Sequence, residues 1–329
     1  MIKRLFVSCS VLLLCISASA FWSHHSADTK SGKLAAIKTV IIDPGHGGLY
    51  PGCKGLISTE KDVTLEIALR LGDALQKAYP DIKVIYTRTT DACSGNATNL
   101  RDDLHNRAKI ANDARGDLFI SIHCNATQQA AGSFYMKRVI GHRKKVVMVG
   151  RGKRKRKKTV NEPIYESYLV KNMRIGTETY VWKASKAVDK LHAINSNDET
   201  GEVLEDSTAE ASAFDITKPE FNIRTQLYEK KFFGNSVNLA QLVEDEFTNS
   251  GRTSYGVKQR DVGIQVLQAT GMPSILVETG FLTNKEEEEY LNSDKGQDEV
   301  VTDIVLAFGK YKQYIETSKN GKPQGAASN

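Results

Sequence analysis

The stretch Lys38-Thr-Val-Ile-Ile-Asp-Pro-Gly-His46 opens the pattern that decides the fold. Its β-branched apolar run ends at Asp43 and is followed by Pro-Gly, which predicts a buried strand running into a loop. Apolar periodicity and turn residues further along predict, in order, a helix, a strand, a helix and a strand: Glu60–Tyr79, Lys83–Thr87, Asp102–Asp113 and Asp117–His123. This alternation favours an α/β fold with a mostly parallel sheet flanked by helices on both faces.

The same pattern resumes near the end of the chain. It comprises Ile264–Leu267, an apolar strand Ser274–Val277 that ends at Glu278, and helices through about Tyr314. Two less regular segments separate the halves, and we interpret them as insertions into a single domain. One, about 127–175, is basic. The other, about 183–235, is acidic, and helical patterns occur in this part of the chain at Ser185–Ile194 and Ile223–Phe247.

The first twenty residues have the three parts of a secretory signal peptide. A charged start is followed by the apolar run Leu5–Ile16 and by Ala18-Ser-Ala20. The run is shorter than the roughly 20 residues of a membrane-spanning helix. A lipid-anchored variant at Cys9 or Cys15 is less favoured, because the small residues expected before such a cysteine are absent. We therefore expect an exported protein, periplasmic or extracellular, with no stable membrane insertion after cleavage.

The expected organisation has four parts. A signal peptide covers 1–20, a mobile N-terminal segment with His24 and His25 covers 21–37, the catalytic domain with both insertions covers 38–317, and a polar flexible tail covers 318–329. With 329 residues and 40% hydrophobic content, the chain can bury a sizeable core.

Three cysteines lie beyond the predicted cleavage site. Cys53 and Cys93 occur in glycine-containing loop sequence and could form a disulfide in an oxidising compartment, although sequence gives no spatial proximity. Cys124 lies inside an apolar strand, which predicts an inert buried thiol.

The formal net charge of +6 is concentrated in one place. The basic run Lys137–Lys158 contains twelve Lys and Arg residues, and the rest of the chain is acidic. In an intracellular protein such a run would suggest nucleic acid, but the predicted export favours anionic wall or envelope polymers, or lipid headgroups. A solvated loop without a specific partner is the alternative.

Side chains that can carry chemistry follow three of the predicted strands. His46, His123 and Glu278 each come directly after, or end, a buried run. In open parallel sheets the functional site lies beyond the carboxyl ends of the strands. A catalytic zinc takes three protein ligands and keeps one position open. Glu60, at the start of the first helix, is the candidate third ligand, although an acidic residue in a first turn also suits the helix dipole.

Other polar residues near these motifs have more than one interpretation. Asp43 and Asn125 flank the candidate ligands and could orient them, or Asp43 could cap the turn after its strand. The remaining histidines, His105, His142 and His192, are expected at the surface.

Five blocks of sequence carry a resemblance: Asp43-Pro-Gly-His-Gly-Gly48, Glu60-Lys-Asp62, Arg107-Ala-Lys-Ile-Ala-Asn112, Ser121-Ile-His-Cys-Asn-Ala126 and Val277-Glu-Thr-Gly-Phe-Leu-Thr-Asn284. Their order and spacing from about Thr39 to Tyr314 resemble the zinc-dependent N-acetylmuramoyl-L-alanine amidases of the amidase 3 family.

This resemblance implies that His46, Glu60 and His123 bind Zn²⁺ and that Glu278 is catalytic. It also implies that the substrate is peptidoglycan, cut at the amide between N-acetylmuramic acid and L-alanine. Two alternatives remain open. One is a zinc peptidase of related architecture that cuts within a peptide. The other is a wall-binding module without catalysis, held by the basic run.

Some relatives in that family carry an insertion whose helix covers the zinc site until an activator displaces it. The segment Trp182–Phe233, with the acidic stretch Asp198–Asp206, lies in the corresponding part of this chain. A carboxylate from it could occupy the open zinc position, which makes a protein activator a candidate partner. A solvated acidic loop is the alternative.

Overall fold

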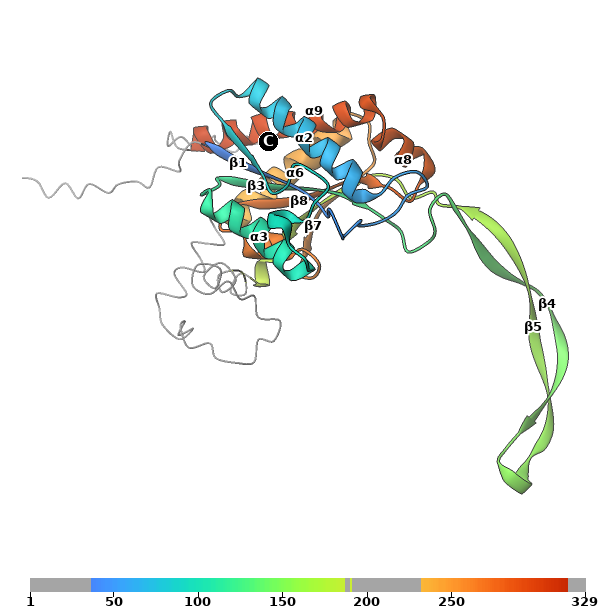
Figure 1. The fold of residues 1–329 in the computed structure, drawn as a ribbon. Coiled ribbons are helices and arrows are strands. Elements are labelled where there is room, and N and C mark those ends of the chain that lie inside the picture. Colours follow the sequence, from blue (N-terminus) through green and yellow to red (C-terminus); the bar gives the residue numbers. More distant parts are fainter. Residues whose placement is uncertain (1–36, 187–189, 191–231, 319–329) are drawn as a thin grey trace, which may run out of the picture. The chain divides into compact units, whose positions relative to one another are not determined.

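A computed structural model describes residues 37–186, 190 and 232–318 (Figure 1). Its centre is a six-stranded sheet of order β2-β1-β3-β8-β6-β7. The strands are β1 Thr39–Pro44, β2 Lys83–Tyr86, β3 Leu118–Asn125, β6 Thr177–Trp182, β7 Ser254–Arg260 and β8 Ser274–Phe281. Strands β2, β1, β3 and β8 are parallel, β6 runs antiparallel to β8, and β7 is parallel to β6. The predicted mostly parallel α/β fold is confirmed.

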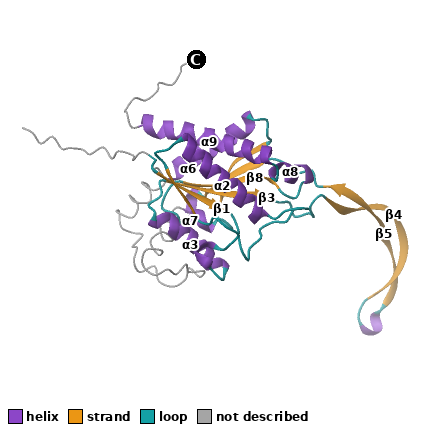
Figure 2. Ribbon diagram, turned by 45° about the horizontal axis from the view of Figure 1, so that its top comes forward, coloured by secondary structure: helices purple, strands orange, loops and turns teal. Residues whose placement is uncertain are grey.

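Helices cover both faces of this sheet (Figure 2). One layer contains α2 Glu60–Ala78, α6 Gly234–Asn249 and α9 Asp294–Thr317, and the other contains α3 Leu100–Asp113 and α7 Gln265–Ala269. The short helix α8 Lys285–Leu291 follows β8. Asn284 begins α8 by accepting a hydrogen bond from the backbone N–H of Glu287, and Ser293 begins α9 in the same way at Gly296.

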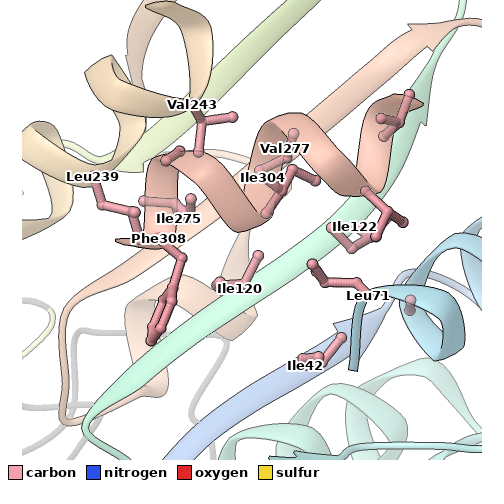
Figure 3. Close-up of a cluster of buried hydrophobic side chains, with 14 of the residues drawn as sticks. Ile42, Leu71, Ile120, Ile122, Leu239, Val243, Ile275, Val277, Ile304 and Phe308 are labelled. Carbon is pink, nitrogen blue, oxygen red and sulfur yellow. The ribbon is translucent and has the colours of Figure 1, made fainter. Parts of the chain in front are cut away.

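Alternating side chains of the central strands supply the two layers of core. Val40 and Ile42 pack on the side of α2, α6 and α9, whereas Ile41 packs on the opposite side. Figure 3 shows part of the larger cluster, whose labelled members are Ile42, Leu71, Ile120, Ile122, Leu239, Val243, Ile275, Val277, Ile304 and Phe308. Strands β1, β3 and β8 are buried on both faces of the sheet, which explains why their sequences are nearly continuous apolar runs.

The basic insertion is a long hairpin rather than an irregular loop. Strands β4 Ser133–Val149 and β5 Arg156–Lys171 pair antiparallel and form a separate two-stranded sheet (Figure 1). We call residues 133–171 the β4–β5 hairpin. Lysines and arginines occupy many of the strand positions and interrupt the apolar alternation, so the sequence pattern concealed the strands.

The second half of the sheet also differs from the prediction. Strands β6 and β7 were not predicted, and β6 lies between the two predicted insertions. The helical pattern Ile223–Phe247 corresponds to α6 from Gly234 onward. This helix packs against the sheet and is part of the core. The segment Ile264–Leu267 overlaps α7. Of the predicted helix Ser185–Ile194, the structure describes only Ser185 and Lys186, which belong to the 3-10 turn Ala184–Lys186, and Lys190, which is helical.

Several predictions fall outside the described residues: the signal peptide, His24, His25, His192, Asp198–Asp206 and the tail after Ser318. Among the residues that are described, no helix is long and apolar enough to cross a membrane. Cys53, Cys93 and Cys124 are free thiols, so the disulfide considered for the first two is not formed. Burial raises the pKa of Cys124, as expected for an inert thiol.

Candidate metal centre

Three of the four predicted site residues converge at the carboxyl edge of the sheet. The Nε2 atom of His46 lies 3.1 Å from Oε2 of Glu60, and Nδ1 of His123 lies 2.9 Å from Oε1 of the same carboxylate. One candidate ligand atom from each of the three residues lies within 4.8 Å of the others. His46 comes from the loop after β1, Glu60 from the first residue of α2, and His123 from β3.

Glu60 is held from several sides. Its side chain is buried, and the backbone N–H groups of Cys53 and Cys124 donate to its two oxygens at 2.9 and 3.1 Å. Burial by itself would raise the pKa of Glu60. The hydrogen bonds with His123 and His46 lower the pKa by more than burial raises it, so the pKa of Glu60 lies well below the usual range. The carboxylate is therefore anionic and fixed between the two imidazoles.

Two glycines allow the three residues to approach. A Cβ atom on Gly45 would lie 2.5 Å from ring atoms of His123, and one on Gly52 would lie 2.4 Å from Oε2 of Glu60. Gly52 also has φ of +69°, a left-handed conformation that favours glycine. His46 has φ of +61°, so its own backbone is strained where it presents its ring.

Two buried arginines hold the His46 loop in that conformation. Arg107 donates to the carbonyls of Pro44 and His46, and Arg88 donates to those of Pro44 and Gly45 at 3.0 and 2.8 Å. Burial lowers the pKa of Arg88 to about 10, so it still carries its charge at neutral pH. The sequence analysis did not predict this role of Arg88. The one indication in the sequence was that a cationic residue directly follows the predicted strand Lys83–Thr87.

Asp43 forms its hydrogen bonds with residues other than the candidate ligands. Its carboxylate accepts hydrogen bonds from Arg107 at 2.8 Å, Thr87 at 2.5 Å and Ser121 at 2.7 Å. Burial opposes ionisation, but Arg107 and the two hydroxyls together lower the pKa of Asp43. Asp43 therefore positions Arg107, which in turn holds the His46 loop, and neither interpretation from the sequence described this role.

Glu278 lies on β8 directly opposite His123 of β3 in the parallel register. Burial raises its pKa well above the usual range, and the carboxylates of Glu60 and Glu178 add to the effect. Its Oε2 atom is buried, and none of the described residues hydrogen bonds to it. Buried polar atoms normally have partners, so this atom marks a place prepared for a ligand or a reacting group.

A second polar cluster adjoins Glu278 and was also missed. Glu178 of β6 is opposite Glu278 in the antiparallel register, and it accepts hydrogen bonds from Asn125, Tyr180 and Lys258. Burial opposes ionisation of Glu178, but Lys258 and Tyr180 lower its pKa. Asn125 thus binds Glu178 and does not orient a candidate ligand. The strand β6 was not predicted, so the sequence could not bring these residues together.

The other histidines lie apart from this centre. His142 is exposed on β4, as predicted. His105 on α3 is only partly exposed, and its Nδ1 is buried without a hydrogen bond from any described residue, so the prediction of a surface residue was wrong in part. His105 belongs to α3, and it is not one of the three residues that form the candidate metal cluster.

The donor set suits a divalent metal ion. Two imidazoles and one carboxylate are the ligands that catalytic zinc sites commonly use, and the buried unpaired oxygen of Glu278 supplies a group beside them. This arrangement at the carboxyl edge of an α/β sheet is one that metal-dependent hydrolases use.

The chain belongs to the N-acetylmuramoyl-L-alanine amidase family, whose model matches residues 40–310. The germination-specific N-acetylmuramoyl-L-alanine amidase of Bacillus subtilis is 41% identical over 108 residues, which are 30% of this chain and 45% of that protein. The amidase AmiC of Escherichia coli O6:H1 is 26% identical over 276 residues, or 83% of this chain and 52% of AmiC. The chain thus spans about half the length of these two relatives.

A solved structure has a similar fold. The CwlD amidase of Clostridioides difficile, in complex with the GerS lipoprotein, superposes with a TM-score of 0.50 at 20% identity, covering 84% of this chain and 99% of that one. At this identity the likeness concerns the fold alone.

Proposed function

We propose that the protein is a zinc-dependent N-acetylmuramoyl-L-alanine amidase. It would hydrolyse the amide between N-acetylmuramic acid and L-alanine in peptidoglycan and so release stem peptides during wall remodelling or daughter-cell separation. The convergence of His46, Glu60 and His123 beside the unpaired carboxyl of Glu278 is the observation that carries this proposal. Membership in the amidase family supports the choice of bond.

His46, Glu60 and His123 would hold the zinc ion. A zinc ion with an open position makes water a better nucleophile near neutral pH and polarises the amide carbonyl. Glu278 would accept the proton of the attacking water and pass it to the nitrogen of the leaving L-alanine. Burial, together with the carboxylates of Glu60 and Glu178, raises the pKa of Glu278, which is the direction that makes a carboxylate a stronger proton acceptor.

Digestion of purified peptidoglycan with and without a chelator tests the proposal. We expect the untreated enzyme to free intact stem peptides and to leave intact glycan, the chelated enzyme to be inactive, and added Zn²⁺ to restore activity. Mass spectrometry of the products separates this outcome from cleavage within the peptide, which would identify a peptidase. Equal product release with and without the chelator would exclude a metal-dependent reaction.

Export to the periplasm or beyond and a protein activator belong to the same proposal. The predicted signal peptide supports export, and the related CwlD amidase has been solved in complex with a lipoprotein. An autoinhibitory role for the segment Trp182–Phe233 stays a hypothesis, since most of it lies outside the described residues. Deletion of 191–231 should raise activity on purified wall if this hypothesis holds. Unchanged activity with an intact fold would remove it.

A further inference from the structure

The β4–β5 hairpin has two chemically different faces. In an antiparallel pair, directly opposed residues lie on the same face, and successive residues alternate between faces. In β4 the alternation shifts by one residue at the irregularity between Val139 and Gly141. Opposed pairs such as Arg138 with Glu166 and Arg143 with Glu162 define what we call the paired face. Opposed pairs such as Val139 with Tyr165 and Lys144 with Asn161 define the opposite one, which we call the open face.

Carboxylates occur only on the paired face of the hairpin. Glu166 forms an ion pair with Arg138, and Glu162 forms ion pairs with Arg143 and Lys145 at 2.7 and 2.6 Å. The guanidinium of Arg138 also lies 5.5 Å from the ring centroid of Tyr168 on the same face. Both carboxylates of the hairpin are therefore engaged on this face, whose cations nearest the tip, Arg156 and Lys158, have no ion pair among the described residues.

The open face combines lysines with exposed apolar side chains and contains no acidic residue. Its lysines are Lys137, Lys144, Lys157 and, at the base of the hairpin, Lys171. Its apolar side chains are between 50% and 75% exposed: Tyr135, Val139, Val146, Met148, Tyr165 and Leu169. Exposed apolar side chains gathered in this way, with cations between them, are typical of a surface that meets a partner.

The connection between the strands adds positive charge. Seven of the eight residues from Arg151 to Lys158 are Lys or Arg, and all eight are exposed. None of these cations forms an ion pair with another residue in the described part of the chain. The hairpin thus presents an uncompensated cluster at its tip and an apolar, cationic strip along the open face.

We propose that the open face and tip of the β4–β5 hairpin adsorb to a bilayer surface containing anionic phospholipids. Lysine and arginine would contact the phosphate headgroups, while Tyr135, Tyr165 and the aliphatic side chains would enter the boundary between headgroups and acyl chains. A soluble polyanion would satisfy the charges but would leave the apolar strip in water. A bilayer interface accommodates both, which is why we favour lipid over a wall polymer.

The base of the hairpin connects this surface to the candidate metal centre. The N–H of Gly132 donates to the carbonyl of Thr283 at 3.0 Å, and the side chain of Asn284 donates to the carbonyl of Asn172 at 2.8 Å. Thr283 and Asn284 lie two and three residues after the end of β8, the strand that carries Glu278. Adsorption would therefore hold the catalytic domain at an envelope membrane, and this inference stands whether or not the amidase activity is demonstrated.

Co-sedimentation of the full chain with vesicles tests the proposal. We use vesicles of phosphatidylcholine alone and of phosphatidylcholine with phosphatidylglycerol, and expect binding to the anionic vesicles that weakens as salt is raised. Replacing Lys137, Lys144 and Lys157 by Gln should lower the partition coefficient about 100-fold. Replacing the opposed pair Val139 and Tyr165 by Ser should lower it about tenfold.

Matched control variants show whether a loss of vesicle binding comes from the open face itself or from a general loss of charge or structure. Met136→Ser with Tyr168→Ser removes an opposed pair from the paired face, and Lys109→Gln, Lys285→Gln and Lys295→Gln remove three exposed charges from the helices. Both control sets should bind anionic vesicles like the unchanged protein. Far-ultraviolet circular dichroism verifies that each variant keeps its fold.

Four results would overturn the proposal. They are no binding to anionic vesicles, equal binding to neutral vesicles, equal losses in the two opposed-pair variants, and retention of vesicle binding when Lys137, Lys144 and Lys157 are replaced. Binding to soluble polyphosphate without binding to vesicles would identify a polymer-binding hairpin instead. Concentration-dependent self-association abolished by Val139→Ser with Tyr165→Ser, again without vesicle binding, would identify a surface for a second copy of this chain.

Discussion

Glu60 organises the candidate metal centre at the level of single residues. Each of its two oxygens contacts one histidine and one backbone N–H. The sequence offered a helix-dipole explanation for this residue, yet its carboxylate is buried and points between the two imidazoles. A carboxylate with only a dipole role would lie in solvent, so the geometry favours the ligand interpretation.

Replacing Glu278 should separate chemistry from metal binding. Glu278→Gln keeps the size of the side chain but removes the proton acceptor, and we expect product release to fall by about 10²- to 10⁴-fold. The zinc content, measured by atomic emission, should stay unchanged. The matched control is Glu289→Gln on α8, an exposed glutamate that forms an ion pair with Lys285. If Glu278→Gln retains full activity, Glu278 is not the catalytic base.

Gly45 should be needed for metal binding, because the absence of a side chain at this position leaves room for the ring of His123. A Cβ at this position would displace the ring of His123, so we expect Gly45→Ala to weaken zinc affinity about 10- to 100-fold, as changes around metal ligands do. Competition with a chromophoric chelator measures the affinity. Gly234→Ala is the control, because a Cβ there would meet no atom within 4 Å. Unchanged affinity in Gly45→Ala would mean that His123 does not bind the metal in the position described.

At the level of elements, α3 reaches across the edge of the sheet to support the loop after β1. Arg107 of α3 is fully buried, and it bridges Asp43, Asp103 and the carbonyls of Pro44 and His46. The arginine appeared in the sequence only as part of a family motif. Its physical role is to form ion pairs with two buried carboxylates and to donate hydrogen bonds to the carbonyls of Pro44 and His46.

Arg107→Met should therefore destabilise the whole domain. It leaves Asp43 and Asp103 buried without a cation, and we expect a loss of about 3 kcal/mol or more in the free energy of unfolding, measured with urea. Arg138→Met is the control: its exposed pair with Glu166 should contribute less than about 1 kcal/mol. A small effect of Arg107→Met would show that the loop conformation does not depend on this ion pair.

The stability supplied by Asp43 should depend on pH. The pKa of Asp43 is lowered in the folded state, chiefly by Arg107 against the opposing effect of burial. The stabilisation is thus fully present above the unfolded pKa of about 4 and is lost as pH falls towards the folded value. Urea unfolding between neutral pH and pH 3 should show this decline, and Arg107→Met should reduce it. An identical pH dependence in both proteins would contradict the assignment.

The elements that could be predicted from sequence are those in which apolar residues recur regularly on the positions that face the core. Strands β1, β3 and β8 and helix α2 are apolar on the positions that face the core, and they brought His46, Glu60, His123 and Glu278 to one edge of the sheet. Strands β6 and β7 mix polar residues with few apolar ones, and the register that places Glu178 beside Glu278 depends on long-range pairing. Such pairing leaves no local pattern in the sequence.

For the molecule as a whole, the β4–β5 hairpin should be dispensable for folding. Its strands pair with each other, and its hydrogen bonds to the rest of the domain lie at the base. Phe134 and Val170 are directly opposed, so Asn-Gly can close the chain between them in a two-residue turn. We expect this shortened protein to keep its melting temperature within a few degrees and its activity on soluble wall fragments. Global unfolding would show that the hairpin stabilises the sheet.

The order in which the strands enter the sheet has a consequence for the newly made chain. All three candidate ligands lie within the first 123 residues, whereas Glu278 arrives on β8, which is inserted between β3 and β6. The sheet cannot close before this late strand is available, because β8 pairs with strands from both halves of the chain. A chain interrupted during synthesis could thus gather the three candidate metal ligands but would lack Glu278, the proposed base. The hydrolysis proposed above would therefore require the complete domain, with β8 inserted between β3 and β6.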